Sequence, residues 1–196
     1  FGVTEVLIGE MGDIELPGLV DSKTRRMLTV NPRQDILFAR IEGGDWKRVA
    51  TIDETFRPIL EAAMRYRGDW AGEFDEGRKE FIEELQDNAD PRVKALVIAE
   101  LDKMPYEMLR RMDMRIPPDE LISGLWMISE APSQAIRALL LGLSDDEAAH
   151  REIHDFINRV EDRSLVRNLG AFAAALIEID GVAGVASTGA VGVLRV

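Results

Sequence analysis

Two histidines are the residues of this sequence best spaced for metal chemistry. His150 and His154 lie four positions apart in the stretch His-Arg-Glu-Ile-His, so both imidazoles would project from one face of a helix and could hold one zinc ion. The zinc-protease orders require a glutamate directly beside one of the histidines, and Glu152 is adjacent to neither. Glu147 and His150 have the Glu-x-x-His spacing of carboxylate-bridged metal bundles, but such bundles need a second pair. We therefore predict a solvated helix face, with a metal-dependent hydrolase as the alternative.

Carboxylates also cluster in a predicted loop at residues 68–75. Asp69, Glu73, Asp75 and the following Glu76 could supply oxygen ligands to a calcium ion. The segment lacks the alternating ligand spacing and the central glycine of a calcium-binding loop. We therefore predict a charged, solvated loop.

Other catalytic arrangements are missing from the sequence. It contains no Gly-x-Ser-x-Gly elbow and no glycine-rich phosphate loop. It also has no cysteine, which leaves few possible nucleophiles. We accordingly predict no catalytic residue, no cofactor and no metal ligand.

Aromatic residues point instead to contact with a partner, because protein interfaces favour tryptophan, tyrosine and arginine. Trp70 and Phe74 lie in the acidic loop, where Trp70 could contact a partner or fill the joint between two domains. Trp126 stands between Leu125 and Met127 and is predicted to lie in the core.

The charge balance argues against nucleic acid as a partner. The 196 residues include 36 acidic and 24 basic side chains, with a net charge of −12 and a pI near 4.7, whereas phosphate binding needs a basic face. No apolar run reaches the ~20 residues needed to span a bilayer. The sequence opens on Phe1 and lacks cysteine, which is compatible with an exported or periplasmic protein whose signal peptide has been removed.

The first 54 residues are predicted to form a small antiparallel β module, because short apolar runs alternate there with turn residues. Gly43-Gly44-Asp45 is the clearest hairpin turn. A helix capped by Asp53 or Thr55 follows and would cover the sheet. The domain boundary is expected just before this helix or in the loop at 68–75. The predicted strands are Val6–Ile8, Met27–Val30, Ile36–Ile41 and Trp46–Ala50.

The chain from residue 55 to residue 180 is predicted to be mainly helical. Asp90-Pro91 supplies a cap and a first-turn proline to a central helix. Ser144-Asp145-Asp146-Glu147 is predicted to be a capping box for a helix reaching about Val160. Three helices are apolar on nearly every side and must be covered on both flanks. They lie at residues 90–101, 135–143 and 166–177.

These three helices share a further pattern. Val93-Lys94 recurs as Ile136-Arg137 and again as Val166-Arg167, each near the start of an apolar helix. Helix pairs that repeat at roughly 40 residues are typical of α-solenoids. Asp90, Pro91, Val93 and Lys94 resemble the Asp-Pro-x-Val-Arg start of the second helix in HEAT repeats, with lysine where arginine is usual.

The resemblance covers residues 80–179, and its later copies depart from the pattern. Pro132 lies two positions early in the second copy, while the third has Asp162 one position early and no proline. The resemblance implies a stack of antiparallel helix pairs, in which the cations pack toward a carboxylate of a neighbouring repeat. An irregular helical bundle is the alternative.

Together these observations predict an α+β protein. It has a β module at residues 1–54, a HEAT-like helical domain at 55–180 and a glycine-rich tail at 181–196, whose conformation stays open. The leading hypothesis is a non-enzymatic scaffold that binds another protein through its helices. The alternatives are the metal-dependent hydrolase and a structural subunit of a larger assembly.

Overall fold

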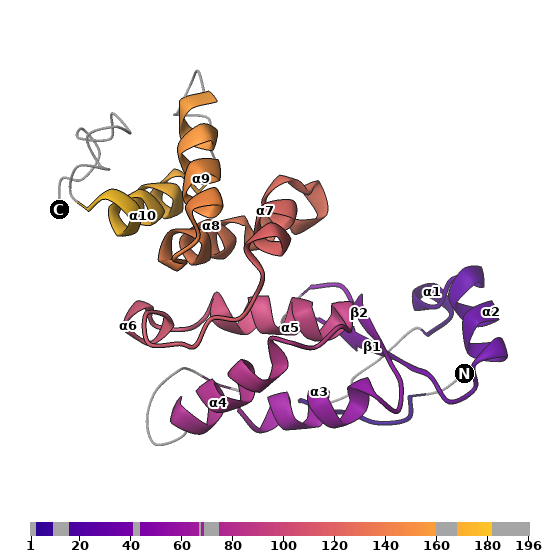
Figure 1. Cartoon of the computed structure of the whole chain (residues 1–196). Coiled ribbons are helices and arrows are strands. Elements are labelled where there is room, and N and C mark those ends of the chain that lie inside the picture. Colours follow the sequence, from indigo (N-terminus) through magenta and orange to yellow (C-terminus); the bar gives the residue numbers. More distant parts are fainter. Residues whose placement is uncertain are drawn as a thin grey trace. The chain divides into compact units, whose positions relative to one another are not determined.

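The computed structural model describes residues 3–9, 16–40, 44–66, 68, 75–159 and 168–181. The chain divides into two compact units, residues 1–67 and 68–196, and each is described by itself. The first unit contains a two-stranded antiparallel sheet and the second contains helices (Figure 1), which confirms the predicted α+β class. Within the described ranges, no helix combines the length and apolar character needed to cross a membrane.

The first unit is built around one β-hairpin. Its strands β1 and β2 pair antiparallel, with Asp35 opposite Ile52 and Ala39 opposite Lys47, and the register shifts between Leu37 and Phe38. The two strands match two of the four predicted ones. The elements of this unit are α1 (Leu16–Leu19), α2 (Ser22–Val30), β1 (Asp35–Ala39), β2 (Lys47–Ile52) and α3 (Phe56–Arg65).

The other two predicted strands are wrong. Residues 3–7, which include most of the predicted strand at Val6–Ile8, have no regular structure. Met27–Val30 forms the end of α2, whose start is capped by Asp21 through a 2.7 Å hydrogen bond from the Thr24 N–H. A short apolar run fits a helix as well as a strand, and the cap six residues earlier favours the helix.

Helix α3 follows β2, and Asp53 is the one of its two predicted caps whose side chain bonds to the start of the helix. The carboxylate of Asp53 accepts hydrogen bonds from the backbone N–H groups of Thr55 (3.1 Å) and Phe56 (2.9 Å). Phe56 is buried, and Arg57 pairs with Asp35 on β1. The division between residues 67 and 68 places α3 in the same unit as the strands. It lies beyond residue 54 and next to the loop at 68–75, the other position considered for the boundary.

The first helix of the second unit is α4, and the predicted central helix is α5. Asp90 caps α5 by accepting a 2.8 Å hydrogen bond from the Arg92 N–H, and Pro91 occupies the first turn. The elements are α4 (Asp75–Leu85), α5 (Pro91–Leu101), α6 (Tyr106–Leu109), α7 (Pro118–Trp126), the 3₁₀ helix η1 (Ile128–Ser133), α8 (Gln134–Leu143), α9 (Glu147–Arg159) and α10 (Leu169–Asp180).

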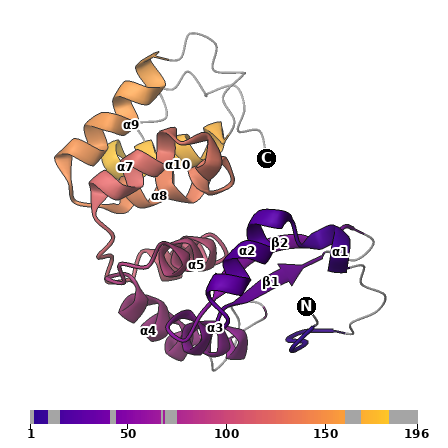
Figure 2. The same cartoon turned by 90° about the vertical axis from the view of Figure 1, so that its right-hand side faces the viewer.

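Helix α8 lies at the centre of the second unit (Figures 1 and 2). It packs against α7, α9 and α10, and less extensively against α5, while α7 also packs against α9. Most of its residues are buried, so the helix predicted to be apolar on nearly every side is covered on several flanks. The completely buried side chains of α8 and α10 are Ala138, Leu140, Leu141, Phe172, Ala175 and Leu176.

The predicted capping box before α9 needs a correction. Asp146 is the residue that caps this helix, because its Oδ1 accepts a 2.8 Å hydrogen bond from the Ala149 N–H. The Ser144 hydroxyl instead donates to the Leu141 carbonyl oxygen (2.8 Å) at the end of α8. Both Ser144 and Asp146 are capping types, so residue type alone could not place the first turn.

A buried ion pair links α4 to α5. Arg78 is 4% exposed and donates from Nε to Glu100 Oε2 (3.1 Å) and from Nη1 to the Gly68 carbonyl oxygen (3.1 Å). Lys103 donates to the other oxygen of Glu100 (2.8 Å). Burial, the largest single influence, raises the pKa of Glu100, but the hydrogen bonds and charges of Lys103 and Arg78 together bring this pKa below its ordinary value of 4.5.

This lowered pKa predicts how stability depends on pH. A carboxyl group whose pKa falls on folding stabilises the folded state above its ordinary pKa, and that contribution is lost as the pH falls through the folded-state pKa. Glu100→Gln should therefore lower the free energy of unfolding at pH 7 by about 1–2 kcal/mol, and the deficit should shrink below pH 4.5. Urea unfolding at pH 7, 4.5 and 3.5 measures the deficit.

The control for this experiment is Glu84→Gln, which removes one charge at an exposed position of the same helix as Arg78. It should leave the stability nearly unchanged at each pH. A deficit in Glu100→Gln that stays constant from pH 7 to pH 3.5 would show that folding does not lower the pKa of Glu100.

Candidate functional site

The two histidines of α9 contact different groups. His150 Nε2 lies 2.6 Å from the Ser144 carbonyl oxygen, and His154 Nε2 lies 3.2 Å from Asp180 Oδ2 at the end of α10. Across the described ranges, no three His, Cys, Asp or Glu side chains come close enough together to hold a metal ion. This geometry gives no support to the metal-dependent alternative.

The acidic loop and its aromatics fall largely outside the described part of the chain, as do Val166-Arg167 and the glycine-rich tail after Gly181. Asp75 is the first residue of α4, and Glu76 is exposed in its first turn. The loop residues 69–74 lie outside the described ranges, and they include Asp69, Trp70, Glu73 and Phe74.

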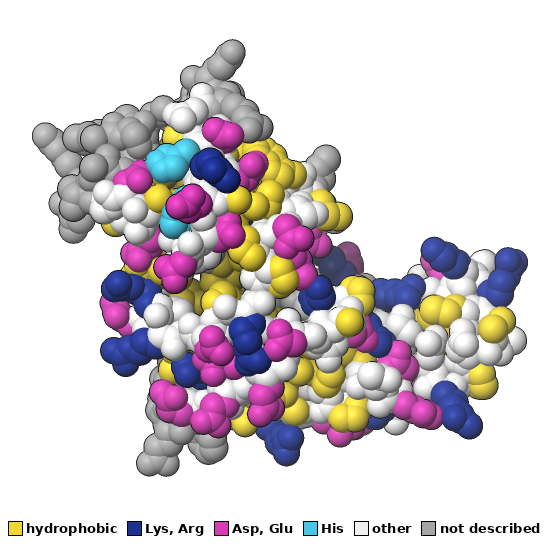
Figure 3. All heavy atoms as spheres, viewed as in Figure 1, with side chains coloured by type: hydrophobic (Ala, Val, Ile, Leu, Met, Phe, Trp, Pro, Cys, Tyr) yellow, Lys and Arg dark blue, Asp and Glu magenta, His cyan; other side chains and the backbone are white. Residues whose placement is uncertain are grey.

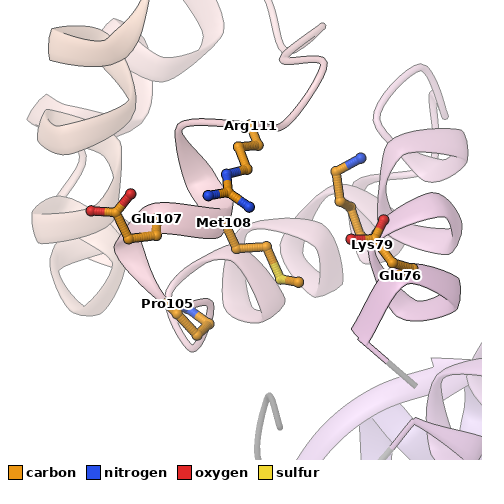
Figure 4. Close-up of a pocket in the computed structure, with 6 residues that line it drawn as sticks. All are labelled: Glu76, Lys79, Pro105, Glu107, Met108 and Arg111. Atoms are coloured by element: carbon orange, nitrogen blue, oxygen red, sulfur yellow. The ribbon is translucent and has the colours of Figure 1, made fainter. Parts of the chain in front are cut away.

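A hollow lies between α4 and the segment around α6 (Figure 4). Two of its lining residues are acidic and two are basic, and Lys79 already pairs with Glu83 on its own helix at 3.1 Å. Because the opposite charges are equal in number, this hollow selects neither an anion nor a cation. Its lining residues are Glu76, Lys79, Pro105, Glu107, Met108 and Arg111.

Trp126 is the clearest departure from the predicted core. It is 48% exposed, and the adjacent Met127 is 52% exposed, the highest values for large apolar residues in the described part of the second unit. Helix α7 buries Leu121 and Leu125, which lie four positions apart on one face. Trp126 is the next residue, about 100° around the helix axis, so it points away from that face.

The exposed indole of Trp126 is nevertheless held in one position. Its Nε1–H donates to Glu152 Oε1 on α9 (3.0 Å), and its ring centroid lies 5.3 Å from that of Phe156. Phe156 in turn stacks on the completely buried Phe172 of α10, with centroids 4.0 Å apart and ring planes within 7°. An aromatic column therefore runs from the core to the surface, and a partner that contacts Trp126 would lose little side-chain entropy in ordering it.

A hollow of about 370 Å³ opens beside Met127, along the first turn and one side of α7. Figure 3 shows apolar side chains at the surface between α9 and α7, with acidic side chains around them. We call Trp126 and this hollow the α7 surface. The hollow is lined by Asp119, Glu120, Ser123, Gly124, Met127, Glu130 and Arg137.

Arg137 on α8 forms the floor of the α7 surface. This side chain is 7% exposed and donates from Nε to Ser133 Oγ (3.1 Å), from Nη1 to the Glu120 carbonyl oxygen (3.4 Å) and from Nη2 to Glu130 Oε2 (3.0 Å). The guanidinium also needs the glycine at position 124, where a Cβ atom would lie 2.4 Å from the Arg137 Cζ. The positive charge of Arg137 is thus already neutralised by an ion pair with Glu130.

Two of the three cations singled out in the sequence, Lys94 and Arg137, contact the first turn of α7. Lys94 on α5 pairs with the carboxylate of Glu120, while Arg137 on α8 bonds to the carbonyl oxygen of the same residue. Asp119 is exposed and, among the described residues, has no ion-pair partner. The rim of the hollow therefore carries unbalanced negative charge.

The sequence contained a signal for this surface that its interpretation missed. Leu125, Trp126 and Met127 are three successive large apolar residues at the end of a helix. Successive helical residues point about 100° apart, so all three are covered only where neighbouring elements pack on several sides of the helix. Comparison with protein-family models, curated proteins and solved structures finds no match to the chain. The function of the α7 surface must therefore follow from its own geometry.

Proposed function

We propose that this protein is a non-enzymatic scaffold that binds another protein through the α7 surface. The observation that carries the proposal is the half-exposed indole of Trp126, held by Glu152 and Phe156 next to the exposed Met127. Fixed aromatic side chains of this kind supply much of the binding energy at protein interfaces.

The packing of the second unit supports a scaffold role. Helices α4 and α5, α7 and α8, and α9 and α10 are in contact as successive pairs, α7 also contacts α9, and α8 contacts α5 and α10. The first helices α7 and α9 are thus in contact, and the second helix α8 contacts the second helices α5 and α10. This arrangement favours the helical-repeat organisation that the resemblance to HEAT repeats implies, and repeat proteins commonly bind their partners along such stacks.

A capture experiment tests this function. The protein, tagged and returned to the cells that produce it, should retain a stoichiometric protein partner, and Trp126→Ala should reduce the retained amount at least tenfold, because truncating an interface tryptophan costs about 2 kcal/mol or more. Ile177→Ala is the matched control, since this apolar residue of α10 is also partly exposed. Quantitative mass spectrometry of the captured material measures both effects.

Two results would count against the proposal. Capture of the same partner at equal levels by wild type and Trp126→Ala would move the interface away from the α7 surface. Retention of no partner by the wild-type protein would remove the scaffold function itself.

A further inference from the structure

We propose that the α7 surface recognises a short segment of the partner that carries a lysine or arginine next to a large apolar side chain. This inference rests on the proposed function and adds the chemistry of the partner. Two features of the surface carry it: an apolar platform at Trp126 and Met127, and an acidic hollow that begins at Met127.

The apolar platform sets the first requirement. Trp126 and Met127 are neighbours in the chain and each exposes about half of its surface. Burying them against an apolar side chain removes that area from water. Methionine adapts to the shape of its neighbour, while the indole of Trp126 is held in place by its hydrogen bond to Glu152. A leucine-sized or aromatic side chain fits this combination.

The charge of the hollow sets the second requirement. Three carboxylates and one guanidinium line it. The buried guanidinium is bonded to Glu130 and Glu120 pairs with Lys94, so Asp119 is the carboxylate left over. Asp119 has no ion-pair partner among the described residues, and the Glu130 side chain is still 37% exposed. An incoming cation would meet these carboxylates, whereas an incoming anion would be repelled.

The net charge of the surrounding unit also favours a basic partner. Residues 68–196 carry 25 acidic and 14 basic side chains, whereas residues 1–67 carry 11 acidic and 10 basic ones. The acidic excess of the chain therefore lies almost wholly in the unit that bears the α7 surface. Such a field steers basic partners toward it and weakens as salt is added.

The size of the hollow limits the occupant to a segment. A volume of about 370 Å³ accepts one or two side chains, not the face of a folded domain. The apolar side chain would rest on Trp126 and Met127, and its basic neighbour would enter the hollow toward Asp119 and Glu130.

Fluorescence anisotropy with three labelled peptides tests the inference. The peptides are eleven residues long and share one leucine pattern, with Lys, Gln or Glu at the remaining positions. The Lys peptide should bind about tenfold more tightly than the Gln peptide, and the Glu peptide should not bind. The affinity of the Lys peptide should fall at least tenfold in Trp126→Ala and about threefold in Asp119→Asn. It should not change in Glu84→Gln, which removes one charge elsewhere on the same unit.

The other outcomes separate the inference from the function it rests on. Equal binding of the Lys, Gln and Glu peptides that Trp126→Ala abolishes would overturn the basic partner and leave the interface in place. Equal weakening by Asp119→Asn and Glu84→Gln, or no binding of the Lys peptide, would also overturn it. Self-association of the protein that Trp126→Ala abolishes would place a second copy on the surface instead.

Discussion

Replacing Gly142 with alanine is expected to lower the free energy of unfolding by about 2–3 kcal/mol, although alanine is the better helix former. Gly142 lies in α8, where it faces α10 at close range. A Cβ atom there would lie 2.5 Å from the Cα of Ala175, 2.7 Å from its Cβ and 2.8 Å from its carbonyl oxygen. These distances are shorter than a Cβ atom tolerates to a non-bonded atom, and backbone cannot move aside as a flexible side chain can. The two helices would therefore have to separate, which costs more than the ~1 kcal/mol that alanine contributes through helix propensity.

Gly170→Ala is the matched control for Gly142→Ala. Gly170 lies in the first turn of α10, is exposed, and has no atom within 4 Å of the position its Cβ would take. Alanine should stabilise this site by up to ~1 kcal/mol. Urea unfolding can be followed by Trp126 fluorescence in a Trp46→Phe, Trp70→Phe background, where Trp126 is the only tryptophan. Stabilisation by both glycine substitutions would show that α8 and α10 do not approach closely at Gly142.

Replacing Phe172 with alanine should cost still more, about 3–5 kcal/mol of unfolding free energy, the usual range for a completely buried phenylalanine. Phe172 has no exposed surface and lies on α10 against the central helix α8. Its loss would leave a cavity and remove the ring on which Phe156 stacks. Helices α8 and α10 cannot move closer together to fill this cavity, because they are already in close contact at Gly142.

The same substitution should also affect the surface. Trp126 contacts Phe156, and Phe156 contacts Phe172, so Phe172→Ala removes the inner end of the aromatic column. The fluorescence anisotropy of Trp126 should therefore fall in the folded variant. Ile177→Ala, at a partly exposed position of the same helix, should change the stability by less than about 1 kcal/mol. A similar loss in both variants would mean that Phe172 is not part of the core.

Much of the local structure was readable without coordinates because its signals lie within a few residues of each other. Asp90 caps α5 as predicted, and Asp53, one of the two residues predicted to cap α3, bonds to its first N–H groups, since a cap bonds only to the next two or three N–H groups. The hairpin of β1 and β2 was found from its alternating runs and glycine turn. Met27–Val30 was misassigned because four residues cannot separate the two periodicities.

The site was harder to predict, because exposure depends on which faces of a helix its neighbours cover. The apolar neighbours of Trp126 favoured the core, but α7 packs on α8 and α9 with Leu121 and Leu125 buried and the indole half exposed. The spacing of His150 and His154 indicated one helix face correctly, yet their contacts come from Ser144 and from Asp180 at the end of another helix.

From sequence alone, the chain is an acidic α+β protein with a hairpin near its start and helices after it, because charge, caps and hydrophobic period are properties of neighbouring residues. Tertiary structure alone decided that Gly142 is a helix contact, that Arg137 is the floor of a hollow, and that Trp126 lies at the surface. Each of these depends on a second helix that is far away in the sequence. Pairing between distant helices sets which side chains are covered, and no local pattern records it.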